Sequence, residues 1–221
     1  MLLPFQLAFG FTSAFIPYYI FGTVVVDSPH LGIRAVGVLS SLIVLVGALS
    51  AIPAAYMSNM VGKPYVIAIG GACIAIIGLF IFAFSDSSLG MWIAMIPLVS
   101  IYGLGRGVWE TINKAVFVDF FSDDVDKCAA AFSAATFANG YAAGMGFLAF
   151  SFMKREEMAV LLVITSIAAL VAYMYAFKMQ NQRKEIERYN AQAQAQVDAI
   201  RDAGQQSRRA KERTAEMKSS T

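Results

Sequence analysis

Six long apolar runs alternate with short polar stretches along most of the chain. The runs cover residues 2–26, 35–57, 65–84, 91–120, 129–153 and 158–177. About 20 residues at 1.5 Å each are enough to cross the roughly 30 Å hydrocarbon core of a bilayer. The pattern therefore predicts an all-α, polytopic membrane protein, with a six-helix transmembrane bundle over residues 1–178 and a charged tail over residues 179–221.

Composition supports a membrane protein. The chain is 58% apolar and 14% charged, whereas soluble domains carry about 25% charged residues. The first run begins almost at Met1, and its sequence MLLPFQLAFGF has neither a basic leader nor a small-residue cleavage site. We therefore expect a spanning helix rather than a signal peptide, and a chain that starts in this way indicates that an upstream part is missing.

Lysine and arginine near the ends of the runs predict the orientation. Six crossings place both termini on one side, and that side has more basic residues than the other. It holds Lys63, Lys127, Lys178, Arg183, Lys184 and Arg188, against Arg34, Lys154 and Arg155 on the opposite side. Both termini are thus predicted to be cytoplasmic. The tail is expected to be partly helical or disordered, with contact between its basic residues and anionic lipid as an alternative.

The fourth run carries most of the polar chemistry, in the sequence GLGRGVWETINKAVFVDFF at residues 103–121. At 100° per residue, positions 110, 113 and 117 lie within about 40° of position 106. Charged groups beside so apolar a run are expected to face protein or water. The candidate residues for a cavity or a helix lock are Arg106, Glu110, Asn113 and Lys114, together with Asn139 from the fifth run.

The expected depth of these residues favours the lock. If Met91 marks the outer boundary, Arg106 lies about 22 Å along the helix and Glu110 about 28 Å. This spacing predicts that Glu110 and Lys114 lie near the inner interface, where charge has a low energetic cost. A local ladder of ion pairs at i,i+4 spacing would suffice there. A substrate or proton path is the alternative, and other polar groups that could line it are Gln6, Tyr18, Tyr19 and Tyr102.

Small residues indicate close contacts between helices. Gly103 and Gly107 flank Arg106, and Gly140 and Gly144 form a G-x-x-x-G pattern in the fifth run. Because this fifth run is rich in alanine and glycine, we expect it to be central. The G-x-x-x-G pattern predicts packing within the chain or, alternatively, contact with a second copy.

The sequence contains no pattern typical of an enzyme or a metal site. Cys73 and Cys128 are far apart, and His30 is the single histidine. There is no His-Glu-x-x-His pattern, no serine beside a base and no phosphate-binding loop. We expect no catalytic residue, no cofactor, no metal and no nucleic-acid partner.

Two segments resemble a known family. The sequence at 103–121, followed by AAAFSAATFANGYAAG at 129–144, resembles the C-terminal half of uncoordinated-93-like proteins, a branch of the major facilitator superfamily. The turn AYMSNMVGK at 55–63 is similar to the cytoplasmic loop motif of that superfamily. Gly62 and Lys63 match the motif, while Ala55, Asn59 and Met60 replace its usual Gly, Asp and Arg.

The resemblance implies that the six helices correspond to the seventh to twelfth of a twelve-helix fold, with a substrate cavity between two halves. The implied partners are the lipid bilayer and either a missing N-terminal half or a second six-helix chain. The implied function is solute or ion transport. The alternative is a non-transporting regulatory or trafficking subunit of a channel or receptor, which the sparse charge of the other helices favours, because coupled transport usually needs buried ionisable groups.

Overall fold

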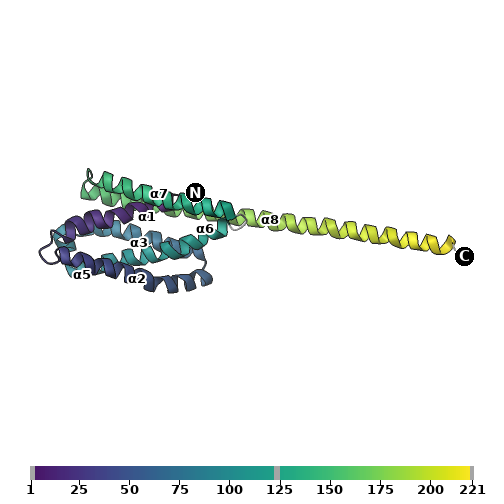
Figure 1. Cartoon of the computed structure of the whole chain (residues 1–221), viewed down its shortest axis with the longest axis horizontal. Coiled ribbons are helices and arrows are strands. Elements are labelled where there is room, and N and C mark those ends of the chain that lie inside the picture. The colour runs from purple at the N-terminus through teal and green to yellow at the C-terminus, as the bar shows by residue number, and fades with distance from the viewer. Residues whose placement is uncertain (1–2, 122–124, 220–221) are drawn as a thin grey trace. The chain divides into compact units, whose positions relative to one another are not determined.

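The computed structural model describes residues 3–121 and 125–219, and these form helices joined by short turns, with no strand among them (Figure 1). The all-α prediction is confirmed. Two segments, η1 and η2, are π-helical. The elements are α1 (Leu3–Phe15), η1 (Ile16–Val25), α2 (Ile33–Met60), α3 (Lys63–Ala83), α4 (Asp86–Leu89), α5 (Trp92–Val108), η2 (Trp109–Asn113), α6 (Lys114–Phe121), α7 (Val125–Phe150) and α8 (Arg155–Ser219).

Within the described residues, five helical stretches are long and apolar enough to cross a membrane. They are Pro4–Val25, Ile33–Met60, Lys63–Ala83, Trp92–Phe120 and Arg155–Gln196. These stretches are consistent with a multi-pass membrane protein. The 26-residue helix α7 is long enough but is not one of the five, because its glycines and polar residues lower its hydropathy. A crossing by α7 stays a prediction.

The chain divides into two units, Met1–Phe177 and Lys178–Thr221. The second unit is helical as far as Ser219. Contacts at i,i+4 spacing support this helix: Arg183 Nε donates to Glu187 Oε1 at 2.8 Å, and the Gln194 amide donates to Asp198 at 3.1 Å. Of the two forms expected for the tail, partly helical or disordered, the described residues have the helical one.

Helices of the first unit lie side by side along their length (Figure 1). Helix α1 runs parallel to α7, with the backbone of Gly10 against Asn139 and Ala142. Helix α5 packs parallel to α2 and also contacts α3, to which it runs antiparallel. Helix α8 packs on α3, where the Ser166 hydroxyl donates to the carbonyl oxygen of Gly71 at 2.6 Å.

The hydrophobic core of this unit is divided in two. One cluster gathers side chains from residues 14–25, 35–43, 77–81, 89–102 and 150–162. The other gathers side chains from residues 5–9, 54, 66–67, 108–117, 135 and 169–176. On α5 the stretch between the clusters is 103–107, and on α1 it is 10–13. Apart from Leu104 and Phe11, glycine and polar residues occupy both stretches, so few apolar side chains of α5 and α1 join the two clusters.

Candidate functional site

Helices α5 and α2 approach closely at two glycines. A β-carbon on Gly103 would lie 2.7 Å from the carbonyl oxygen of Ile43, and one on Gly107 would lie 2.5 Å from that of Gly47 and against the Ser50 hydroxyl. Only glycine leaves room for this approach. Both positions thus have the close helix contact that the sequence predicts for them.

These contacts show how far along the helices the charged residues lie. Gly47, which lies against Gly107, is 14 residues from Ile33 and 13 from Met60. Cys73, which lies against Gly105, is 10 residues from either end of α3. Arg106 is itself 14 residues from each end of the Trp92–Phe120 stretch. Arg106 therefore lies halfway along three neighbouring helices.

The arrangement gives the position of Glu110 along the helix, while its depth in a membrane stays a prediction. At 1.5 Å per residue, Glu110 is only about 6 Å from the middle of the stretch. Our sequence argument placed it near the inner interface because a span of ordinary length was counted from Met91. The stretch has 29 residues, about 43 Å of helix, so its middle falls at Arg106.

Arg106 and Glu110 form an ion pair. Arg106 Nε donates to Glu110 Oε1 at 2.8 Å, and the two side chains are 39% and 48% exposed. Lys114 is also exposed, and among the described residues it makes no ion pair with Glu110. Only the first step of the expected Arg106–Glu110–Lys114 ladder is therefore present.

The π-helical segment η2 divides the predicted polar face. A π-helix has more residues per turn than an α-helix, so it rotates the side chains that follow. Asn113 is 4% exposed and Phe117 is 5% exposed, whereas Glu110 and Lys114 face outward. The four positions expected on one face thus separate into an outward pair, Arg106 and Glu110, and an inward pair.

Trp109, the first residue of η2, joins α5 to α1. Its ring stacks on Phe9 with centroids 4.4 Å apart and on Phe5 with centroids 4.6 Å apart. Towards the Trp92 end of α5, Tyr102 donates to the Ser13 hydroxyl at 3.4 Å. Because α1 and α5 run antiparallel at these contacts, Arg106 lies at about the level of Gly10 and Glu110 at about the level of Gln6.

Two neutral polar side chains lie near these levels. Asn139 contacts Gly10 through its backbone, and Gln6 is one helical turn away on α1. Gln6 is 3% exposed, and its Nε2 has no hydrogen-bond partner among the described residues; the same holds for Asn139 Oδ1. Buried polar atoms are nearly always paired. These two are therefore exceptions that need an explanation.

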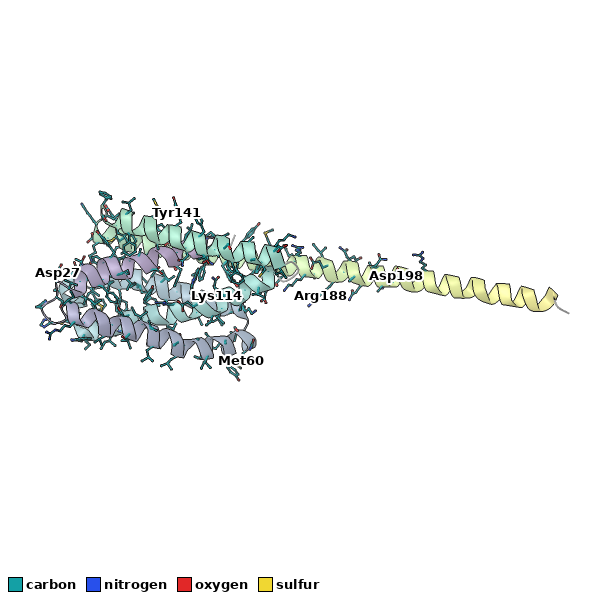
Figure 2. The ribbon with its side chains drawn as sticks, in the orientation of Figure 1. Asp27, Met60, Lys114, Tyr141, Arg188 and Asp198 are labelled. Carbon is teal, nitrogen blue, oxygen red and sulfur yellow. The ribbon has the colours of Figure 1, made fainter. Side chains whose placement is uncertain are left out.

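Gly140 and Gly144 differ from the glycines of α5. They lie on the exposed side of α7, and a β-carbon on either would meet nothing within 4 Å. Tyr141 on this helix points outward and is 57% exposed (Figure 2). Helix α7 buries one face against α1 and leaves the other open, so contact at this pair within the described chain is absent. The alternative, contact with a second copy, stays a prediction.

The loop motif has a contact that sequence reasoning missed. Lys63 Nζ lies 2.6 Å from Asp119 Oδ2 at the end of α6. Gly62, with φ of +96°, precedes the first residue of α3 in a conformation that favours glycine. The available signal in the sequence was that Asp119 has the opposite charge to Lys63 and a similar expected depth.

A second charged cluster joins three elements at the other end of the unit. Arg155 Nη1 lies 3.1 Å from Asp86 Oδ1, which also accepts from the Tyr19 hydroxyl at 2.6 Å. Arg155 Nη2 donates to the carbonyl oxygens of Ile81 and Phe84. Sequence analysis placed Tyr19 among cavity-lining residues, whereas here its hydroxyl group belongs to this structural cluster.

The described residues contain no candidate metal site. No three His, Cys, Asp or Glu side chains among them lie close enough to hold an ion, and the thiols of Cys73 and Cys128 are both free. The chemistry that the Arg106–Glu110 site offers is therefore hydrogen bonding and charge. Comparison with protein-family models, curated proteins and solved structures gives no match.

Proposed function

We propose that this chain is a transporter-like integral membrane protein of the major facilitator superfamily, forming one six-helix half of a twelve-helix solute or ion transporter. The observation that carries the proposal is the Arg106–Glu110 pair. It lies halfway along the helices, yet both side chains are partly exposed on this unit. Ionisable groups at this depth face protein or water rather than lipid. The exposed side then faces a cavity or a second six-helix body.

Helix α7 supports the same arrangement. Its open face carries small and polar residues between large apolar side chains such as Phe137 and Leu148, and its hydropathy is lower than that of the five apolar stretches. A helix that faced lipid on this side would be expected to be more apolar. The open residues of this kind are Ser133, Gly140, Gly144 and Ser151. In the proposed assembly this face lies beside the second half and the termini are cytoplasmic.

Uptake measurements test the proposal. The full chain is expressed in cells, where a second copy can supply the other six-helix half, and uptake of a solute panel is compared with that of Arg106→Gln and Glu110→Gln variants at equal membrane abundance. We expect each variant to reduce uptake of the transported solute at least tenfold. Arg183→Gln and Glu187→Gln are matched controls, because that pair has the same spacing and the same 2.8 Å distance but lies in the tail. The controls should transport normally.

The non-transporting alternative predicts a different result. A regulatory or trafficking subunit would show no uptake above untransfected cells for any solute, and the Arg106 and Glu110 variants would alter only abundance or partner recovery. A residue that lines a transport path instead changes uptake while the membrane abundance of the protein stays constant. The same set of variants thus separates the two functions.

A further inference from the structure

The ion pair leaves much of its hydrogen-bonding capacity unused. Arg106 bonds Glu110 through Nε alone, and among the described residues neither side chain makes another hydrogen bond or ion pair. The two terminal nitrogens of Arg106 and Oε2 of Glu110 are therefore unpaired by the protein. A guanidinium presents these terminal donors as a planar fork that matches a carboxylate. A carboxylate oxygen accepts from an ammonium group.

Charge balance restricts what the pair can hold. As an ion pair, Arg106 and Glu110 have no net charge. Towards the inner end, Lys114 lies one helical turn from Glu110 and adds a positive charge, whereas the pair of Lys63 with Asp119 is neutral. A cargo with net charge would leave that charge near the middle of the membrane, where the energetic cost is large. A cargo that carries one positive and one negative group leaves the site neutral.

We infer that the site binds a small zwitterion with a carboxylate and a primary ammonium group, such as an α-amino acid. Arg106 binds the carboxylate through its terminal nitrogens, and Glu110 accepts hydrogen bonds from the ammonium group. The Nε–Oε1 bond between the two side chains keeps them aligned while the cargo is held. This inference rests on the transport function proposed above, and it names the substrate class.

Direct binding tests the inference with matched probes. The full chain is purified in detergent micelles, and its thermal unfolding is recorded with L-alanine, L-leucine and L-phenylalanine. Each is compared with its N-acetyl form, which lacks the ammonium group, and its amide, which lacks the carboxylate. We expect at least one of the amino acids to raise the melting temperature in the millimolar range, while its two derivatives do not.

Variants make the result specific to the pair. Arg106→Gln and Glu110→Gln should each lose the zwitterion-dependent shift, and Arg183→Gln should keep it. The double variant Arg106→Glu with Glu110→Arg keeps the pair and its neutrality, so it should recover part of the shift if the single variants fail only through folding. Recovery of the shift in this double variant would therefore support the inference.

Three outcomes would overturn it. One is an N-acetyl amino acid that binds as well as the amino acid, which would indicate a proton-linked anion. Another is a shift that persists in Arg106→Gln. The third is uptake of some solute that depends on Arg106 while no amino acid binds or competes; in that case the transport function stands and the substrate class is wrong. Absence of both uptake and binding would reject both proposals.

Discussion

At the scale of single residues, the layer between the two core clusters combines close backbone contact with unpaired polar atoms. Gln6 is almost fully buried, and its Nε2 has no hydrogen-bond partner in the part of the chain that the structure describes. Leaving such a group unpaired costs about 1–3 kcal/mol of stability. A residue kept only for packing would be better replaced by an apolar side chain, so the position of Gln6 favours a role in function.

Replacing Gln6 by methionine tests this role. The Gln6→Met side chain has a similar length and no polar group, so we expect it to raise the free energy of unfolding by about 1 kcal/mol or more. If Gln6 serves the transport path, uptake should fall at the same time. The measurements are thermal unfolding in detergent and uptake at equal abundance. A loss of stability instead would show that the amide holds the helices together.

Glycine contacts give a second prediction at this scale. A β-carbon on Gly107 would overlap the Gly47 carbonyl oxygen, whereas one on Gly37 would meet nothing within 4 Å. Gly107→Ala should therefore destabilise the protein by about 1–3 kcal/mol. Gly37→Ala, also inside a helix, should be neutral or stabilising. Thermal unfolding followed by tryptophan fluorescence compares them, and equal effects would contradict the close approach.

At the scale of helices, periodicity predicted some relationships and missed others. The apolar runs placed most helix ends near those observed, and the i,i+4 spacing gave the Arg106–Glu110 pair. The π-helical segment could not be predicted, because nothing in WETIN distinguishes a wider turn from an ordinary one. The depth of Glu110 stays a prediction, but Arg106 lies at the middle of a stretch of 29 residues, which is longer than the span that we counted from Met91. Contacts between distant segments, such as Lys63 with Asp119, depend on packing that a single sequence does not reveal.

The cluster around Arg155 shows how three elements are held together by one side chain. Two of its acceptors, Ile81 and Phe84, belong to the end of α3, where helix carbonyl groups lack partners. Asp86 has a second partner in Tyr19. Arg155 thus satisfies carbonyl oxygens that no other described side chain is seen to reach, while Asp86 contributes mainly the ion pair.

These contacts predict that substitutions of Arg155 and Asp86 have unequal effects on the free energy of unfolding. Arg155→Gln should cost about 1.5–3 kcal/mol, since it removes charge-assisted hydrogen bonds to two carbonyl oxygens. Asp86→Asn should cost at most about 1 kcal/mol, because the ion pair is partly exposed and the Tyr19 contact can remain. Thermal unfolding of both variants and of the double variant measures the difference. Equal single effects would mean that the ion pair alone accounts for the stabilisation.

At the scale of the whole molecule, the number of crossings depends on α7. Hydropathy alone leaves this helix out, yet its packing argues for a crossing. Gly10 of α1 lies against Asn139, and one turn further along Ala14 lies against Gly146. The two helices therefore run parallel at the same depths, and α1 belongs to an apolar stretch that is long enough to span. We therefore expect α7 to have its two ends at opposite faces of the membrane.

Cysteine labelling from outside intact cells tests this crossing, because Cys128 and Ser151 flank α7 and neither is fully buried. With Cys73 replaced by alanine, native Cys128 should label only after permeabilisation, as should an Asn59→Cys variant that also lacks Cys128. Ser151→Cys, in a chain without other cysteines, should label in intact cells together with Ser87→Cys. Labelling of positions 128 and 151 from the same side would mean that α7 does not span. An odd number of crossings would then place the two termini on opposite sides and remove the six-helix half from which the transport proposal follows.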